Sequence, residues 1–535
     1  MPQVIAAPAR GEEDLRLHRD SSARQAIEPG SAHADYVAQP IAWGWLAGLT
    51  VLAAVLRAIA LNQQLWFDEI VTLLDSARRP LSRILTTYDT QNQHMLYSIL
   101  AHGSIRLFGE HAWALRLPAV IFGVACVPAL YFFGRLVTTN REALAASALL
   151  AVNYQHVWFS QNARGYTGML FWTLVASIFF LRSVNGARTR DWVCYGVAAA
   201  LGIYTHLMAA FVVAGHAVIY LWLVLSRTRG ASRNRATLLP LLYGFALCAA
   251  ASLLLYAPVL SHVFARTIGA QGRTAPSDWS SPVWALREMV HGLSAGASGG
   301  LIVLLIAGLV LLSGLISYAR ENPIAAGLAV LPGLATAAAV LAARHNLWPR
   351  FFFFEIGFGL LFLLRGAMLW SETGAKILGG EGKLASRLSA AVILLMLCAS
   401  VIPLRAAYSR PKQDYLGAMR FVEEQRRPGE AIVTVGVVTS PYQRYYGRSW
   451  PLVETEAQLN AALAGHDPVW LIYTMPVSVR AQSPEIWNTI QTQFTMVRVF
   501  PGTLAGGEIY VCKSRSAENE GAPGQGRKSL GENNA

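Results

Sequence analysis

The sequence predicts a polytopic α-helical membrane protein with about 11 transmembrane helices and a small C-terminal α/β extracytoplasmic domain. Three observations support this class. Of the 535 residues, 54% are hydrophobic and only 14% are charged, whereas soluble globular proteins have roughly 25% charged residues. Apolar runs of about 17–25 residues, each long enough to cross a bilayer, recur between residues 41 and 404. After residue 404 the composition changes to short helical and strand-like patterns.

Residues 1–40 are polar, mixed in charge and rich in Ala, Pro and Ser, which predicts a disordered cytoplasmic tail. Residues 41–404 form the predicted membrane domain. Its eleven predicted spans are 41–61, 114–137, 142–160, 166–183, 191–205, 207–225, 238–258, 298–319, 323–343, 350–370 and 386–404. The run 191–225 is too long for one crossing and short for two, so a sharp turn is expected at Tyr204-Thr205-His206.

Loop charges orient these spans. With the N-terminus in the cytoplasm, the inner loops carry a set of basic residues, as the positive-inside rule requires: Arg188, Arg190, Arg227, Arg229, Arg233, Arg235, Lys376 and Lys383. This topology explains the net charge of +13 better than nucleic-acid binding, which we do not expect. An odd number of spans places the C-terminal region outside. The arginine content and the outer C-terminal region fit a bacterial inner membrane.

The first outer loop, 62–113, contains a predicted helix over 93–108 with one apolar face. This helix either lies in the membrane plane or packs on the bundle, and both readings are compatible. The outer α/β domain is predicted over 405–513, and 514–535 is predicted to be a disordered tail. Within the domain we expect a helix over Asp414–Arg426, strands over Ala431–Val438, Val469–Tyr473 and Glu508–Cys512, and a helical segment over Glu456–Leu463.

The stretch Leu65–Thr72 places two adjacent carboxylates, Asp68 and Glu69, at the mouth of the first span. Carboxylates at a membrane surface are costly unless they are solvated, paired or used in chemistry. The outer side also collects arginines that violate the positive-inside rule: Arg78, Arg79, Arg83, Arg106, Arg116, Arg164, Arg344 and Arg350. The simplest alternatives are solvated acids or an acid paired with a loop arginine.

Several segments in this order resemble a known family. They are Leu65–Glu69, Gln93–Ser98, Arg106–Glu110, Ala114–Pro118, Phe159–Thr167 and Tyr204–His206. Together, over residues 40–370, they are similar to GT-C superfamily glycosyltransferases of the dolichyl-phosphate-mannose–protein mannosyltransferase type. This type is glycosyltransferase family 39 with its bacterial relatives, including the lipid A aminoarabinose transferase.

The resemblance implies a GT-C-like membrane enzyme. It would move a sugar, with inversion, from a polyprenyl-phosphate donor to a hydroxyl of a lipid, glycan or protein on the outer face of the membrane. Asp68 would be the catalytic base, with Glu69 beside it. Two motifs depart from the family. His94-Met95-Leu96 stands where relatives often have His-Pro-Pro, and Asn162–Tyr166 stands where they often have Glu-Ala-Arg-Pro-Tyr.

The chemistry itself requires few groups. A base must take the proton of the acceptor hydroxyl, and cations must hold the charge that develops on the phosphate. Guanidinium groups match phosphate geometry. The candidate substrate- and phosphate-binding residues are Arg164, Tyr166, Arg350, His94, His206 and Arg78. The alternatives are arginines that extend to the interface, histidines bonded to backbone in a tight turn, and solvated loop arginines. Glu355 is expected to be structural, paired with Arg365 or a backbone donor.

No cofactor is predicted from the sequence. A divalent metal held by Asp68, Glu69 and a histidine is an open alternative, but the spacing forms no recognised metal motif. Two other function classes compete with the enzyme. A transporter or flippase for a lipid-linked substrate would carry ionisable residues at the bilayer midplane and related halves. A non-catalytic membrane assembly protein would leave the acidic pair and the outer arginines unexplained.

Overall fold

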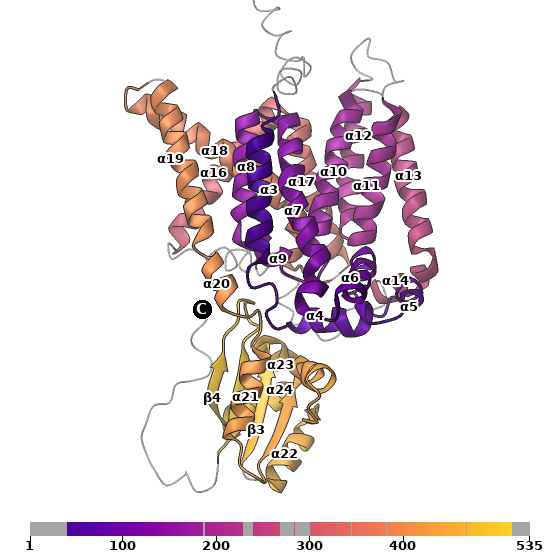
Figure 1. Ribbon diagram of the computed structural model, residues 1–535, viewed down its shortest axis with the longest axis vertical. Coiled ribbons are helices and arrows are strands. Elements are labelled where there is room, and N and C mark those ends of the chain that lie inside the picture. Colours follow the sequence, from indigo (N-terminus) through magenta and orange to yellow (C-terminus); the bar gives the residue numbers. More distant parts are fainter. Residues whose placement is uncertain are drawn as a thin grey trace, which may run out of the picture.

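The computed structural model describes residues 40–185, 188–227, 239–267, 283, 300–343, 345–380, 382–466 and 468–515. A bundle of long helices stands against a smaller α/β region, which lies at one end of the bundle (Figure 1). The predicted tails over 1–40 and 514–535 fall outside the described residues, apart from residues 40, 514 and 515.

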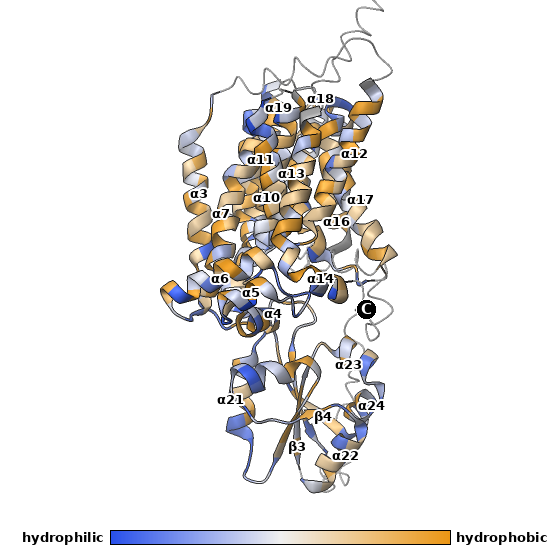
Figure 2. Ribbon diagram, turned by 90° about the vertical axis from the view of Figure 1, so that its right-hand side faces the viewer, coloured by the Kyte–Doolittle hydropathy of each residue, from blue (hydrophilic) through white to orange (hydrophobic). Residues whose placement is uncertain are grey.

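Eight segments of the described chain are long and apolar enough to cross a membrane. They contain the helices α7 (Ala112–Val137), α10 (Tyr166–Asn185), α12 (Ala209–Arg227), α13 (Leu239–Tyr256), α16 (Gly300–Glu321), α17 (Pro323–Ala342), α18 (Ile356–Ile377) and α19 (Gly382–Val401). Hydrophobic residues dominate these helices, whereas α21 (Tyr415–Gln425) and α24 (Pro484–Gln493) of the C-terminal region are largely hydrophilic (Figure 2). The chain is therefore an integral, multi-pass membrane protein.

The expected number of about 11 spans is higher than the eight that qualify by length and composition among the described residues. The other three predicted spans are helical and lie in the bundle, but they are short. Helix α3 (Trp43–Ala58) has 16 residues and α11 (Thr189–Thr205) has 17. The predicted span 142–160 is broken into α8 (Asn140–Val152) and α9 (Tyr154–Ser160).

The break between α8 and α9 has a clear cause. The Asn153 side chain accepts a hydrogen bond from the backbone N–H of His156 and so caps α9. The last carbonyls of α8 then lack helical donors. Arg57 of α3, which is fully buried, donates to the carbonyl of Ala151 (3.0 Å) and to the hydroxyl of Ser160 (3.1 Å). This arginine therefore fastens α3 to both halves of the broken helix.

The predicted division of 191–225 is confirmed. Helix α11 ends at Thr205, α12 begins at Ala209, and the sharp turn lies between them. His206 lies in this turn and is buried. The turn places the end of α11 and the start of α12 beside the segment that follows α9.

The predicted first outer loop, 62–113, folds into four short helices against the bundle. They are α4 (Phe67–Thr72), the π-helix η1 (Leu73–Ala77), α5 (Leu81–Thr86) and α6 (Met95–Phe108). Helix α6 packs on α7: the hydroxyls of Tyr97 and Ser104 donate to the carbonyls of Leu115 and Ala114, both at 2.6 Å. At its C-terminal end Leu107 is 78% exposed. The helix thus packs on the bundle and still presents an apolar end.

The C-terminal region contains one five-stranded sheet in the order β2-β1-β3-β5-β4. Strand β1 pairs in parallel with β2 and β3, and β5 pairs antiparallel with β3 and β4. The region comprises α20 (Leu404–Ser409), α21 (Tyr415–Gln425), β1 (Ala431–Val435), η6 (Gly436–Val438), η7 (Pro441–Tyr445), β2 (Leu452–Val453), α22 (Glu456–Gly465), β3 (Val469–Thr474), α23 (Pro476–Gln482), α24 (Pro484–Gln493), β4 (Phe494–Phe500) and β5 (Ile509–Ser514).

The C-terminal region and the loop that carries Asp68 lie at the same end of the bundle, as the sequence predicted (Figure 1). The C-terminal region contacts both this loop and α9. Arg444 forms an ion pair with Asp75 of η1, and the indole N–H of Trp158 donates to the hydroxyl of Thr503 (2.9 Å). Three further short helices complete this end: η3 (Ala257–Val259), α14 (Leu260–Thr267) and the 3₁₀-helix η5 (Pro349–Glu355).

Candidate active site

Asp68 and Glu69 both lie in the first turn of α4. The Glu69 carboxylate accepts a hydrogen bond from the backbone N–H of Trp66 (3.4 Å), which closes the N-terminus of this short helix. Neighbouring residues on a helix point about 100° apart. The two carboxylates therefore face different surroundings, although they are adjacent in the chain.

Glu69 faces inward and is 0% exposed. The Arg116 guanidinium donates hydrogen bonds to both carboxylate oxygens, at 2.7 Å and 2.6 Å, and the backbone N–H of Ala163 donates to one of them at 2.8 Å. Burial alone would raise the pKa of Glu69, but the Arg116 guanidinium and the Lys412 ammonium hold it below its usual value. Its geometry does not support the predicted direct catalytic role, because no carboxylate oxygen reaches a solvent-accessible surface.

Asp68 faces a cationic cluster. One carboxylate oxygen lies 3.4 Å from a guanidinium nitrogen of Arg164 and 3.4 Å from one of Arg350. The other oxygen accepts a hydrogen bond from the Asn92 side chain (3.2 Å). The Asp68 side chain keeps 10% of its surface accessible, and that of Arg350 keeps 29%. Three segments far apart in the sequence thus converge on one partly open carboxylate.

Three aromatic rings pack against one another beside Arg164. The ring centroid of Tyr166 lies 5.5 Å from that of His94 and 5.0 Å from that of His206, and the two histidine rings are 4.3 Å apart. The Arg164 guanidinium lies 5.8 Å from the centre of the Tyr166 ring, within the range of a cation–π interaction. The structure therefore brings together five of the eight predicted site residues around Asp68.

The two histidines are neutral groups near pH 7. Burial, and next the Arg164 guanidinium, lowers the pKa of His94 well below its usual value and lowers the pKa of His206 to about 3. The Nδ1 atom of His94 accepts a hydrogen bond from the backbone N–H of Gly165 (2.7 Å). These imidazoles contribute packing and hydrogen bonding to the site, and they do not add positive charge.

The turn between α9 and α10 requires a glycine at position 165. A Cβ atom there would lie 2.8 Å from the carbonyl oxygen of Thr205 and 2.9 Å from Nδ1 of His94. Both distances are shorter than a side-chain carbon tolerates. Gly165 therefore allows the turn that carries Arg164 to approach both His94 and the turn after α11.

Two predictions lie outside this cluster. Arg78 pairs with Glu110 at the surface, and its side chain is 46% exposed, so it corresponds to the solvated loop arginine that the sequence left open. Glu355 was expected to pair with Arg365 or with a backbone donor, and it lies against the backbone of Gly333. Arg365 pairs instead with Glu142 and Glu321. These three residues join α18 to α8 and α16.

The arginines of the cluster hold unused donors. In the described part of the chain, the Nε atoms of Arg164 and Arg350 are buried without a hydrogen-bond acceptor, and Nη1 of Arg164 has only its 3.4 Å ion-pair contact with Asp68. Buried N–H groups of a charged side chain are costly to leave unpaired. An anionic ligand beside Asp68 would supply these missing acceptors.

Four residues of this region were not among the predicted site residues. Arg116 was noted only as one of the outer arginines, and its position in the motif Ala114–Pro118 was the available signal. The sequence holds no signal for Asn92, Lys412 or Gln413, because an isolated polar residue in a loop does not indicate which residue it contacts. Lys412 and Gln413 come more than 300 residues after α4, so their contacts depend on the tertiary fold.

Among the described residues, no group of three or more His, Cys, Asp and Glu side chains is placed to hold a metal ion. Asp68 is surrounded by guanidinium and amide groups instead. The histidine nearest the cluster, His94, accepts a backbone hydrogen bond and lies against cations. The donor set around Asp68 therefore does not fit a divalent cation.

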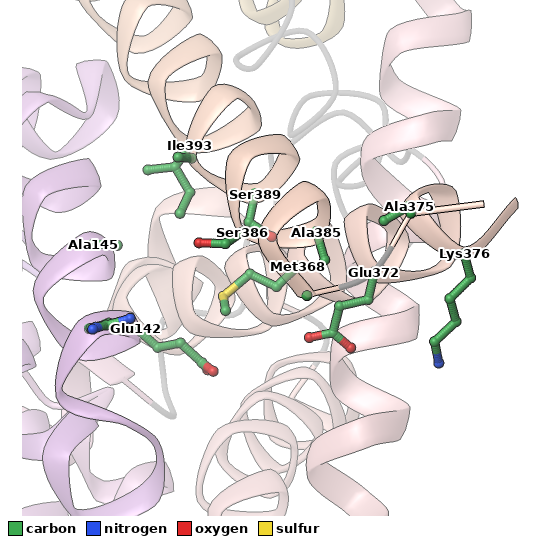
Figure 3. A pocket seen from close by; sticks show the side chains of 14 residues that line it. Glu142, Ala145, Met368, Glu372, Ala375, Lys376, Ala385, Ser386, Ser389 and Ile393 are labelled. Atoms are coloured by element: carbon green, nitrogen blue, oxygen red, sulfur yellow. The ribbon is translucent and has the colours of Figure 1, made fainter. Parts of the chain in front are cut away.

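A cavity of about 530 Å³ lies elsewhere, between α8, α18 and the start of α19 (Figure 3). Its lining includes Glu142, Met368, Glu372, Ser386 and Ser389. Glu142 in this lining pairs with Arg365. None of the residues around Asp68 lines this cavity, so it is separate from the candidate site.

Residues 93–261 match the sequence model of a family described as dolichyl-phosphate-mannose-protein mannosyltransferase. The matched segment holds His94, Arg164, Tyr166 and His206, and it begins after Asp68 and ends before Arg350. It supports the resemblance predicted from the sequence, to membrane glycosyltransferases of the GT-C superfamily. No curated protein sequence matches the chain.

The solved structures that align with the chain include two proteins. ArnT from Cupriavidus metallidurans, bound to undecaprenyl phosphate, is 12% identical, with a TM-score of 0.46 over 89% of this chain and 99% of that chain. The archaeal oligosaccharyltransferase AglB from Archaeoglobus fulgidus, in complex with an inhibitory peptide and a dolichol-phosphate, is 12% identical, with a TM-score of 0.48 over 89% of this chain and 74% of that chain.

Proposed function

We propose that the chain is an inverting glycosyltransferase that moves a sugar from a polyprenyl-phosphate donor to a hydroxyl acceptor on the outer face of the membrane. One observation carries this proposal: a partly open carboxylate lies between two arginines with unused donors, at the end of a membrane bundle. The acceptor is a lipid, a glycan or a protein. The family match over 93–261 supports the same class of reaction.

The two arginines bind the phosphate of the donor in this proposal. Guanidinium groups form short, paired hydrogen bonds with phosphate oxygens. Arg164 comes from the turn between α9 and α10, and Arg350 comes from η5, so they hold the anion from two sides. When the sugar–oxygen bond breaks, the negative charge on the departing polyprenyl phosphate increases. Fixed cations at this place stabilise that charge more in the transition state than in the ground state.

Asp68 acts as the base. Its carboxylate takes the proton of the acceptor hydroxyl while that oxygen attacks the anomeric carbon, and the bond from this carbon to the phosphate oxygen breaks. Attack and departure on opposite faces of the sugar invert the anomeric configuration. Phosphate bound to Arg164 and Arg350 also replaces the Asp68 carboxylate as the partner of these two cations. The carboxylate can then accept the proton of the acceptor hydroxyl.

The proposal includes an orientation. The N-terminus lies in the cytoplasm, and the α/β domain over 405–513 lies outside, in a bacterial inner membrane. The positive-inside distribution of loop charges supports this orientation. The domain then stands on the same side as Asp68, where it meets the acceptor.

The function is tested by comparing three strains: a deletion, a strain restored with the wild type, and a strain restored with Asp68→Asn. Envelope glycans and polyprenyl-phosphate sugars are profiled by mass spectrometry. We expect the deletion and the Asp68→Asn strain to lose the same glycan species and to accumulate its lipid-linked donor. If the Asp68→Asn strain has a normal profile while the deletion does not, the chain acts as a transporter or an assembly protein instead.

Replacement of Arg350 by glutamine is expected to raise the KM for the lipid-linked donor. A hydrogen bond to a charged group contributes about 1.5–3 kcal/mol, which corresponds to roughly 10- to 100-fold in KM. The KM is measured in a transfer assay with the purified variant at increasing concentrations of the donor. Arg405→Gln is the matched control, because Arg405 is an exposed arginine of α20 at the same end of the bundle. Equal KM values for both variants contradict the phosphate role.

A further inference from the structure

The segment 411–414 joins the membrane bundle to the sheet and runs directly along the loop that carries Asp68. It follows α20 and precedes α21. The Gln413 side chain is 0% exposed. Its carbonyl oxygen accepts a hydrogen bond from the backbone N–H of Phe67, the first residue of α4, at 3.0 Å. Its amide group donates to the carbonyl of Gly507 at 3.1 Å. Gln413 thus connects the helix of Asp68 with the loop before β5.

Lys412 connects the same segment to the turn that carries Arg164. Its ammonium group is buried and donates to the carbonyl of Gln161 (2.6 Å), in the turn that carries Arg164. The ammonium also lies 5.2 Å from the centre of the Trp158 ring. On its other side, the Lys412 carbonyl accepts a hydrogen bond from the backbone N–H of Leu504 (3.1 Å). One short segment therefore contacts both halves of the candidate site.

A third connection comes from the membrane side. The Gln64 side chain donates to the Asp414 carboxylate (2.7 Å) and accepts from the backbone N–H of Leu416 (3.0 Å). Phe67 packs against the core cluster of the C-terminal region, which includes Tyr415 and Tyr442. The residues just before Asp68 therefore contact the C-terminal region directly.

Helix α4 needs such support. It has only six residues, and a helix this short is unstable without tertiary contacts. Its first N–H groups have no partner within the helix. Glu69 takes the N–H of Trp66, and Gln413 takes the N–H of Phe67. Without Gln413 the first turn has one fewer fixed contact, directly before the residue whose carboxylate must meet the acceptor.

We propose that Gln413 is a positioning residue for Asp68, so that the C-terminal region is an integral part of the candidate active site. This inference rests on the proposed function of Asp68. Gln413 touches neither the donor nor the acceptor. It fixes the first turn of α4, and through that turn it fixes the direction of the Asp68 carboxylate relative to Arg164 and Arg350. Chemistry is sensitive to such direction, whereas donor binding by the two arginines is not.

The experiment compares Gln413→Leu, Gln413→Glu and Gln443→Leu in the full-length protein. Leucine keeps most of the volume and removes the acceptor, whereas glutamate keeps an oxygen opposite the Phe67 N–H. Gln443 is the matched control, because it bonds only within the C-terminal region, to the carbonyl of Trp450. The donor probe is a total lipid extract of the deletion strain. Transfer rate is measured at increasing amounts of extract, together with the melting temperature of each variant.

We expect Gln413→Leu to lower kcat at least 10-fold relative to Gln443→Leu, with the apparent KM for the extract unchanged within about twofold. Gln413→Glu should recover part of this loss. A kcat equal to that of Gln443→Leu overturns the inference. If Gln413→Leu does not fold, Gln64→Leu is measured in its place. This variant removes the neighbouring hydrogen bonds to Asp414 and Leu416, and Gln64 is only half-buried. Unchanged kcat for Gln64→Leu then overturns the inference as well.

Asp68→Asn is measured in the same assay to separate the two proposals. If Asp68→Asn is inactive and Gln413→Leu matches its control, the inference fails while the proposed function stands. If Asp68→Asn transfers the sugar at the wild-type rate, the proposed function fails, and a role for Gln413 in positioning that carboxylate fails with it.

Discussion

Replacement of Asp68 by asparagine is expected to lower the rate of glycosyl transfer by about 10²- to 10⁴-fold, the usual contribution of a positioned general base. Asparagine has nearly the same shape and can still accept from the Asn92 side chain, but it cannot take the acceptor proton. Donor binding should persist, because Arg164 and Arg350 lose only a carboxylate that competes with the phosphate. The measurement is kcat and the apparent donor KM of the purified variant.

The control for this variant is Glu110→Gln. Glu110 is a carboxylate of the same outer loop, it pairs with Arg78 at the surface, and its side chain is 44% exposed. The same chemical change there should leave kcat within about twofold, because surface ion pairs contribute little to stability. A loss of activity in Glu110→Gln comparable to that in Asp68→Asn would mean that the loop responds to any lost charge.

Replacement of Arg116 by methionine is expected to give the largest loss of stability. It leaves the fully buried Glu69 carboxylate without its partner, and breaking a buried ion pair costs about 3–5 kcal/mol. It also frees three carbonyls that Arg116 binds, those of Leu61, Gln63 and Gln64. Thermal unfolding in detergent and the yield of folded protein measure the effect.

The double variant Arg116→Met/Glu69→Gln should recover part of that stability, since no buried charge then lacks a partner. Recovery equal to zero would mean that the three carbonyl contacts carry the whole effect. The pair also predicts a pH dependence. Because the folded pKa of Glu69 is lowered, its contribution is fully present above the unfolded value near 4.3 and is lost as the pH falls below it. In Glu69→Gln that loss at low pH should be smaller.

Much of the bundle could be predicted because long apolar runs determine long helices. The position of the turn at His206 followed from the length of the run 191–225 alone. The same reasoning did not find the break at Asn153, because the length of a run ignores polar residues such as Asn153 and His156 within it. The break depends on a side-chain cap and on Arg57 of another helix. The length of an apolar run predicts how long a membrane segment is, but local hydrogen bonds determine whether that segment forms one helix or two.

In the C-terminal region, β1, β3 and β5 lie where the apolar patterns predicted strands. Strand β4 was not predicted, because Thr495, Met496, Val497 and Arg498 are exposed on this edge strand and its pattern lacks a buried face. Pairing with β5 determines its conformation. Strand β2, with two residues, is too short for any pattern.

The candidate site shows the same division. Asp68, Arg164, Arg350, Tyr166 and both histidines were predicted from the unusual placement of the charges and from the motifs that carry the family resemblance. The opposite placement of Glu69 required the direction of α4, which the sequence alone does not provide. Arg78 was grouped with Arg164 as an outer arginine, but it pairs with Glu110 at the surface and lies outside the cluster.

The contact of Gln413 with Phe67 also orders events during biogenesis. The two residues are 346 positions apart in the chain, so the ribosome completes every helix of the bundle before it adds the acceptor for the Phe67 N–H. An unfinished chain carries Asp68, Arg164 and Arg350 in the membrane but lacks the last element that aligns them. If Gln413 positions Asp68 as proposed, a chain that ends before residue 413 is expected to transfer sugar more slowly than the full-length chain.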